Sequence, residues 1–400
     1  MNTLSARLAA LSPSQTLAMS QKSNELKAKG IDVINLSVGE PDFPTPTHIK
    51  DAAKKAIDDN ITFYSPVPGF MDLRKAICRK LKQENSLDYQ ENQIVVSNGA
   101  KQSICNTLLA IVNKGDEVII PAPYWVSYPE MVKLAEGSPV ILQTSIHDEF
   151  KITAKALEET ITTNTKALIL CSPSNPTGSV YTRDELRALA EVVAAHPRLY
   201  VISDEIYEHI RYEHAHESIA QFEEIRDRVI IVNGVSKGYA MTGWRIGWIA
   251  ADANIAKACQ LLQGQYTSGA SSVSQMAALE AYTGEQSCVS MMRKAFERRR
   301  DLIVRLMSEI PGIELNNPAG AFYLFPKIDS FLGATYKEKT IHSSTDLAMY
   351  ILEEAHVACV AGDAFGAPEY IRLSYATSDE NIIEAVARLK KALDKLSVDE

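Results

Sequence analysis

The 400-residue sequence lacks the patterns that mark several large classes of protein. No apolar run approaches about 18 residues, so no membrane-spanning helix and no membrane partner are expected. Apart from the short run 298–300, the sequence has no block of lysine and arginine, and the net charge is −9, which argues against a nucleic-acid partner. Residues 1–15 hold a short apolar stretch broken by serine and proline, a poor secretion signal. We therefore expect a cytoplasmic protein.

Cysteines are few, and the common cofactor and metal motifs are absent. The six cysteines include no C-x-x-C pair, so we expect free, buried thiols and neither a disulfide framework nor a metal site. The sequence contains no G-x-G-x-x-G, no P-loop and no H-E-x-x-H. A hydrophobic content of 46% and a charged content of 23% are typical of globular proteins.

Strand and helix patterns alternate through the middle of the chain. This alternation predicts an α/β fold with a mostly parallel sheet sandwiched by helices. We expect a large domain over 45–283 and a smaller α/β domain made of 284–400 with the N-terminal segment 1–44. The apolar runs that predict strands are 93–97, 117–121, 139–143, 166–171, 199–203 and 228–232.

Three local features of the helices can also be predicted. Thr182 and Glu185 have the spacing of a capping box before helix 182–195. Thr45 precedes a helical pattern that begins with a proline, and we expect it to cap that helix. The basic run 298–300 is flanked by acids inside a helical pattern and is interpreted as a solvated face.

Several polar residues directly follow predicted strands, where ligands bind in open parallel sheets. Gly99, Ala100 and Lys101 follow one strand and open a helix. The free N–H groups there can bind an anion, although a simple tight turn explains the same pattern. Ser236 and Arg245 could add a hydroxyl and a guanidinium to that anion site.

Three further residues have both an ordinary and a chemical interpretation. Lys237 is a surface lysine or a lysine that forms a Schiff base with a carbonyl cofactor. Asp204 is a cap, an ion-pair partner, a metal ligand or the partner of the ring nitrogen of pyridoxal phosphate. Arg372 is expected on the strand face opposite Ile371 and Leu373, and is interpreted either as an exposed arginine or as a clamp for a carboxylate.

Residues 234–238 match G-x-S-x-G after a strand, the nucleophile elbow of α/β-hydrolases. The elbow must open a helix, but the following residues 238–244 contain two glycines and no helical face. A hydrolase is therefore the weakest alternative.

Taken together, these residues resemble the class I aminotransferases, which are fold-type I pyridoxal-phosphate enzymes. The likeness runs nearly end to end, with the segments in the order of the family. The segments are SVGEPDF (37–43), YSPVPG (64–69), PYWVSYPEM (123–131), SPSNPTG (172–178), SDEIYE (203–208), SKGYAMTGWRIGW (236–248), GAFY (320–323) and IRLSYA (371–376).

The resemblance implies a seven-stranded-type sheet and a bound pyridoxal 5'-phosphate. It also implies that Lys237 carries the cofactor as a Schiff base, with Asp204 on the ring nitrogen and Tyr207 on the ring oxygen. Trp125 would stack on the ring. The residues implied for the phosphate are Gly99, Ala100, Ser236, Arg245 and, from the neighbouring subunit of a homodimer, Tyr64. Those implied near the substrate are Gly39, Trp125, Asn175 and Arg372, of which Asn175 also reaches the ring oxygen.

Within the family, the chain looks most like the bacterial aspartate aminotransferases of subgroup Iβ. Segment 263–272 lacks the arginine that binds the distal substrate carboxylate in animal-type enzymes. The resemblance gives that role to Lys101, with a hydroxyl near Thr16. Branch members that accept prephenate tend to carry a lysine where this chain has Ser12, which lowers the expectation of prephenate activity.

The expected reaction is therefore transamination between L-aspartate and 2-oxoglutarate by a ping-pong cycle. An aromatic, prephenate or alanine aminotransferase and a β-lyase stay open as alternatives on the same cofactor. A regulator that senses an effector with this fold is less favoured, because the chain shows no basic arm for DNA.

Overall fold

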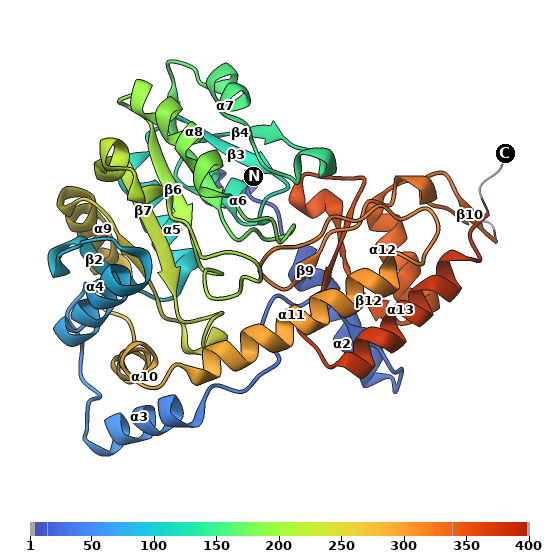
Figure 1. The fold of residues 1–400 in the computed structure, drawn as a ribbon, viewed down its shortest axis with the longest axis horizontal. Helices are drawn as coiled ribbons and strands as arrows, with labels where there is room; N and C mark the ends of the chain where they lie inside the picture. Colours follow the sequence, from blue (N-terminus) through green and yellow to red (C-terminus); the bar gives the residue numbers. More distant parts are fainter. Residues whose placement is uncertain (1–4, 14, 338, 398–400) are drawn as a thin grey trace.

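The computed structural model describes residues 5–13, 15–337 and 339–397. Figure 1 shows a large sheet with helices on both faces and, beside it, a smaller group of short strands and helices. The long helix α11 (Ser287–Met307) extends from the helices beside the large sheet to those of the smaller part.

The large sheet has seven strands in the order β2-β8-β7-β6-β5-β3-β4. β8 runs antiparallel to both of its neighbours, and every other pair is parallel. The predicted α/β fold and mostly parallel sheet are thus confirmed. The strands are β2 (Ile94–Ser97), β3 (Glu117–Ala122), β4 (Ser138–Gln143), β5 (Thr165–Cys171), β6 (Tyr200–Asp204), β7 (Val229–Gly234) and β8 (Gly247–Ala250).

Both faces of this sheet are covered, which explains why its central strands read as continuous apolar runs. One apolar core packs strand side chains against α5, α6 and α9, and a second packs the opposite face against α3, α4, α8 and α10. The helices are α3 (Thr47–Asp58), α4 (Met71–Asn85), α5 (Ala100–Ile111), α6 (Tyr128–Leu134), α8 (Arg183–Ala195), α9 (Ala253–Tyr266) and α10 (Ser272–Thr283).

The smaller part is built around an antiparallel sheet in the order β13-β14-β9 and has its own apolar core. The N-terminal segment joins it, because β1 pairs in parallel with β12. The domain limits themselves stay a prediction. The elements are α2 (Gln15–Ala28), α12 (Ser344–Ala355), α13 (Asp379–Leu393), β1 (Ile34–Asn35), β9 (Tyr323–Leu324), β12 (Val357–Ala358), β13 (Val360–Ala361) and β14 (Ile371–Ser374). Short peripheral elements are α1 (Ala6–Ala9), α7 (Ala154–Thr160), β10 (Thr335–Tyr336) and β11 (Lys339–Thr340).

Two local predictions are wrong. Thr45 does not cap α3, whose N-cap is Pro46; its hydroxyl instead donates to the Ala240 carbonyl at 2.7 Å. In the basic run of α11, Arg299 and Arg300 are buried and only Arg298 is exposed. Arg299 is bidentate to Asp42, which ties α11 to the loop after β1.

The predicted capping box of α8 is confirmed. The six cysteines are free as expected, but only Cys259 and Cys359 are buried, and the other four are half-buried. No helix within the described ranges is both long and apolar enough to cross a membrane.

Candidate active site

A cavity of about 280 Å³ lies where strands of the large sheet end, next to β9 and β14 of the smaller sheet. It gathers most of the residues that the sequence singled out, although they come from segments far apart in the chain. The predicted residues that line it are Gly39, Ala100, Lys101, Trp125, Asn175, Asp204, Tyr207, Ser236, Lys237, Arg245 and Arg372.

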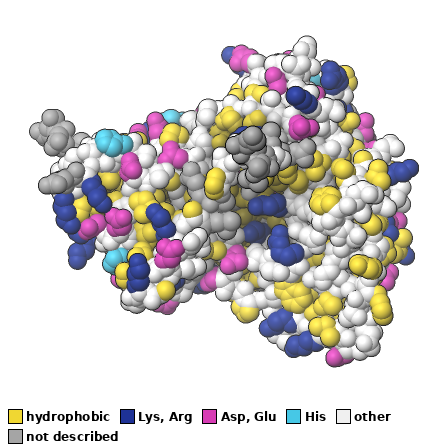
Figure 2. Space-filling view, turned by 180° about the vertical axis from the view of Figure 1, so that it is seen from behind, with side chains coloured by type: hydrophobic (Ala, Val, Ile, Leu, Met, Phe, Trp, Pro, Cys, Tyr) yellow, Lys and Arg dark blue, Asp and Glu magenta, His cyan; other side chains and the backbone are white. Residues whose placement is uncertain are grey.

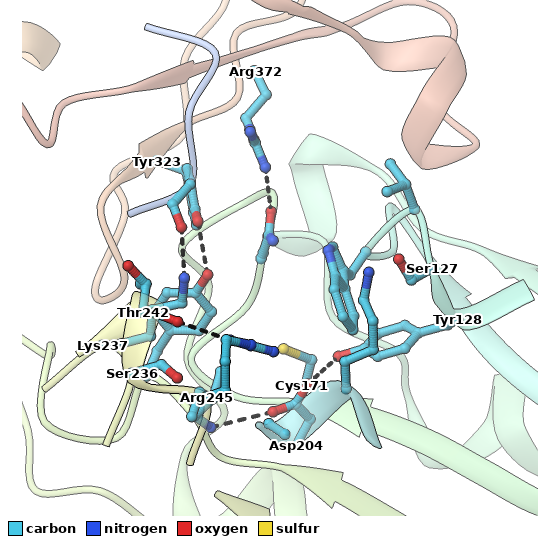
Figure 3. A pocket seen from close by; sticks show the side chains of 18 residues that line it. Ser127, Tyr128, Cys171, Asp204, Ser236, Lys237, Thr242, Arg245, Tyr323 and Arg372 are labelled. Atoms are coloured by element: carbon cyan, nitrogen blue, oxygen red, sulfur yellow. Dashed lines mark hydrogen bonds between the residues drawn. The ribbon is translucent and has the colours of Figure 1, made fainter. Parts of the chain in front are cut away.

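Lys237 follows β7 and points its amine into the middle of this cavity (Figure 3). Its Nζ donates to the Gly39 carbonyl at 2.5 Å, so it bridges the large sheet and the loop after β1. Burial lowers the pKa of the amine from 10.5 to about 8. An amine with such a pKa is neutral in a substantial fraction near physiological pH, as a nucleophile or general base must be.

Asp204 is the last residue of β6 and is buried at the bottom of the cavity. Its Oδ2 accepts from the Tyr128 hydroxyl at 2.6 Å, and its Oδ1 accepts from the Ile206 N–H at 3.2 Å. Burial raises the pKa of the carboxyl to about 6 in spite of these two donors. A cationic group placed beside it would therefore be bound strongly.

At one side of the cavity, Arg245 approaches the N-terminus of α5. Its Nη1 donates to the Thr242 carbonyl at 2.9 Å and its Nη2 to the Asn98 carbonyl at 3.2 Å. Gly99 has a φ of +89°, and a Cβ there would lie 2.4 Å from Nη2 of Arg245. Gly99 therefore shapes the site without lining it. The first N–H groups of a helix have no partner inside the helix, so this side suits an anion.

At the other side, Arg372 of β14 reaches the cavity from above (Figure 3). Its Nη1 donates to the Asn175 side-chain oxygen at 2.9 Å and its Nη2 to the Ser37 carbonyl at 2.6 Å. Its guanidinium carbon lies 4.5 Å from the centre of the Tyr323 ring. The Nε atom is buried and has no partner among the residues that the structure describes, and burial lowers the pKa of the guanidinium.

The cavity is cationic although the whole chain carries a net charge of −9. Among the described residues, no carboxylate lies within 4 Å of the charged nitrogens of Lys101, Lys237, Arg245 or Arg372. Asp204 is the one acid among the lining residues. Figure 2 likewise shows lysine and arginine side chains gathered in the hollow near the middle of one face. Such a cavity favours ligands with two or more negative groups.

Lys101 lies in the first turn of α5, with its Nζ 4.9 Å from the centre of the Trp125 ring. Burial and the charge of Arg245 lower the pKa of its amine. The ammonium is thus held near the cavity without an acidic partner in the part of the chain that the structure describes.

Besides Gly99, the predicted residue Tyr64 does not line the cavity. Tyr64 is 99% exposed and borders a separate surface hollow with Phe63 and Ser271. Thr16 belongs to α2, but its side chain lies outside what the structure describes.

The cavity also contains residues that the sequence reasoning missed, above all Tyr128 and Tyr323. The Tyr323 hydroxyl lies 2.7 Å from the hydroxyl of Tyr207. Both tyrosines occur inside segments that carry the family resemblance, which is the signal that could have found them. A tyrosine in an apolar segment does not reveal its hydrogen-bond partner, so their contacts could not be read from the sequence.

The residues present fit pyridoxal phosphate, the cofactor that the resemblance implies. A phosphate dianion suits the start of α5 with Ser236 and Arg245, while the buried carboxylate of Asp204 suits a protonated ring nitrogen. The amine of Lys237 points into the same cavity, where a carbonyl could be held.

Comparisons with known proteins agree with this geometry. Residues 31–389 match the family of class I and class II aminotransferases. A bifunctional aspartate aminotransferase and glutamate/aspartate-prephenate aminotransferase of Petunia hybrida is 51% identical, over 98% of this chain and 82% of its own length.

Solved structures give the same result. The structure of an aspartate aminotransferase from Rhizobium meliloti is 41% identical, with a TM-score of 0.96 over 99% of this chain and 100% of its own. The structure of the aspartate aminotransferase of Thermus thermophilus with maleate is 39% identical, with a TM-score of 0.92 over 98% and 100%.

Proposed function

The chain belongs to the class I and class II aminotransferases and is a pyridoxal-phosphate enzyme, and from that premise we propose its substrates and its working residues. We propose that it transfers the amino group of L-aspartate to 2-oxoglutarate, giving oxaloacetate and L-glutamate. The two half-reactions use the same cavity in turn, which is a ping-pong cycle.

One observation carries this proposal. The cavity offers two separate anion-binding groups, Arg245 with the start of α5 and Arg372 with Asn175, and the amine of Lys237 lies between them (Figure 3). A cofactor phosphate and a substrate carboxylate would occupy the two groups. An amino acid held in this way would have its reacting carbon beside Lys237.

Each residue then has a definite task. Pyridoxal phosphate, when bound, supplies a reactive carbonyl and a ring that accepts electrons from the Cα carbon. Lys237 takes the Cα proton and returns it, as general base and then general acid, which its pKa of about 8 permits. Asp204 holds a proton on the ring nitrogen. Tyr207 donates its hydroxyl to the ring oxygen, and Trp125 covers the face of the ring.

The preference for a diacid rests on charge counting. Arg372 can clamp only one carboxylate in a bidentate manner. Lys101 is a second cation in the cavity wall that no acid of the described chain neutralises. We assign it to the distal carboxylate of aspartate or glutamate. The maleate named for the Thermus thermophilus structure is also a dicarboxylate, which supports this assignment.

Prephenate is the second candidate substrate, because the Petunia hybrida relative carries it in its name. Prephenate also has two carboxylates, so the same two cations could serve it. Ser12 was expected to lower this activity. The backbone N–H of Ser12 donates to a carboxylate oxygen of Glu130 at 2.8 Å. Both residues line a surface hollow, and this hollow shares Val126 with the wall of the cavity.

The test is a comparison of kcat/KM for aspartate, alanine, phenylalanine and glutamate as donors, with 2-oxoglutarate and prephenate as acceptors. The proposal expects aspartate and glutamate to exceed the donors without a second carboxylate by at least about tenfold, the value of one charge-assisted contact. A preference for alanine or phenylalanine would reject the diacid assignment. Release of pyruvate, ammonia and hydrogen sulfide from L-cysteine, whose β-thiol can leave, would instead indicate a β-lyase.

A further inference from the structure

A tyrosine outside the predicted site makes the shortest contact to Asp204. The Tyr128 hydroxyl donates to the carboxylate at 2.6 Å, and Tyr128 is 2% exposed. Its ring is fixed on two sides, because it is the first residue of α6 and packs edge-on against Trp125 with 5.3 Å between the ring centres. A buried, immobile donor of this kind is pre-organised for the carboxylate that it meets.

We propose that Tyr128 is a positioning residue that acts through Asp204: by donating its hydroxyl to the carboxylate, it keeps the shared proton on the ring nitrogen of the cofactor. The inference rests on the proposed role of Asp204. It adds a residue that determines where that proton lies.

The chemical reason is a competition for one proton. The ring nitrogen and the Asp204 carboxylate are both acceptors, and a hydrogen bond donated to an ionised carboxylate favours its ionised form. Removal of the phenol would make the carboxylate more basic, so that the proton moves toward Asp204. A ring without that proton is a weaker electron acceptor, and abstraction of the Cα proton slows.

The other groups around Asp204 cannot replace this donor. The Cys171 thiol at the end of β5 is kept neutral by burial, which raises its pKa to about 12. Glu205 carries a like charge, and its oxygens are already bonded to Ser203, Ser218 and His216.

The remaining two groups are favourable but weaker. The Ile206 N–H bonds the other carboxylate oxygen at 3.2 Å, a longer contact than that of Tyr128. Lys237 favours the charged form of Asp204 but bonds the Gly39 carbonyl instead.

The experiment uses holoenzyme reconstituted with pyridoxal phosphate labelled with nitrogen-15 in the ring. The nitrogen signal, which reports ring protonation, is followed from pH 6 to 10 in the wild type and in Tyr128→Phe. We expect the nitrogen signal at neutral pH to move toward that of an unprotonated ring in Tyr128→Phe, because the ratio of the proton on the ring nitrogen to the proton on Asp204 should fall at least about tenfold, which matches the loss of a charge-assisted bond. We expect kcat to fall and KM to change little.

A matched control removes another buried phenol. The Tyr350 hydroxyl donates to the Ala392 carbonyl at 2.7 Å in the smaller part of the molecule. Tyr350→Phe should leave the nitrogen titration unchanged. A shift of equal size in Tyr350→Phe would reduce the effect to general destabilisation and overturn the inference.

The outcomes separate this inference from the proposed function. An unprotonated ring in the wild type at neutral pH rejects the role of Asp204 and with it the inference. A protonated ring in the wild type and an identical titration in Tyr128→Phe reject the inference alone.

If Tyr128→Phe does not bind the cofactor, the inference is tested instead by the unfolding equilibria of the apo-proteins. Loss of the hydroxyl should lower the folding equilibrium constant about tenfold or more when Asp204 is present, and much less in an Asp204→Asn background. Equal losses in both backgrounds would show that the hydroxyl does not act on the carboxylate.

Discussion

At the scale of single residues, burial destabilises the charged ammonium form of Lys237. Its pKa of about 8 in the folded apo-protein lies below the ordinary value of 10.5. Below pH 8 the folded and unfolded chains both carry the proton, and the burial cost is present in full. Between pH 8 and 10.5 the unfolded chain binds more protons, so the wild type gains stability as the pH rises.

Lys237→Met apo-protein should therefore be more stable than the wild type at pH 7, by up to about 3 kcal/mol, and this difference should shrink by pH 10. Urea unfolding at the two pH values measures it. The exposed Lys114, as Lys114→Met, serves as the control and should show no such pH-dependent difference. A difference for Lys237→Met that does not change with pH would contradict the buried ammonium.

We expect Lys101 to determine the preference for substrates with a second carboxylate. Lys101→Ala should lower kcat/KM for aspartate and glutamate by roughly ten- to a hundredfold, because a charge-assisted contact to the distal carboxylate is lost. Alanine and phenylalanine have no such carboxylate and should be affected much less. An equal loss for every amino acid, together with weaker cofactor binding, would instead place Lys101 at the phosphate.

Single residues also show which parts of the site can be predicted from the sequence alone. Lys237, Asp204 and Arg372 were predictable because polar residues at strand ends, together with family motifs, point to one edge of a sheet. Tyr128 and Tyr323 were not, because each acts through one hydroxyl whose partner lies at least 76 residues away in the chain. The burial of Arg299 was not predicted for the same reason, because its partner Asp42 lies 257 residues away in the chain.

At the scale of elements, the α8 capping box is a local device that the sequence alone predicts. The Thr182 hydroxyl accepts from the Glu185 N–H, and the Glu185 carboxylate accepts from the Thr182 N–H at 2.7 Å. Thr182→Ala should lower the free energy of unfolding by about 1 kcal/mol, the usual value of an N-cap. Chemical denaturation measures this, and kcat should stay at the wild-type level. A large loss of activity would show that α8 is coupled to the site.

Elements that depend on distant partners were harder to predict. The six parallel strands were expected within a few residues of their bounds, because strands buried on both faces are apolar throughout. β8 was missed because it has only four residues and follows the loop that holds Lys237 and Arg245. Its place between β2 and β7 is set by tertiary pairing. α12 was missed in a region where short strands and turns alternate.

At the scale of the whole molecule, the exposure of Tyr64 has a consequence for assembly. An aromatic ring that is 99% exposed and lies outside the cavity of its own chain suits a contact with a second copy. We expect a homodimer in which Tyr64 of one subunit reaches the cofactor phosphate of the other.

Hybrid dimers test this arrangement. Mixing subunits that carry Tyr64→Ala with subunits that carry Lys237→Ala should restore up to about a quarter of the wild-type activity in the whole mixture, because about half of the dimers are hybrids and each hybrid has one intact site of two. Unmixed Lys237→Ala dimers are the control and should stay inactive. A monomer in sedimentation at the assay concentration would contradict the shared site.

The central claim is that one cavity passes an amino group from aspartate to 2-oxoglutarate through Lys237 and the cofactor. The most direct measurement follows the visible absorbance of the holoenzyme through the two half-reactions separately. Aspartate alone should abolish the absorbance of the lysine-bound cofactor and release one oxaloacetate per site. 2-Oxoglutarate added after removal of aspartate should restore the absorbance and release one glutamate per site, and Lys237→Ala should do neither. An absorbance that does not respond to aspartate, or that 2-oxoglutarate does not restore, would contradict the account.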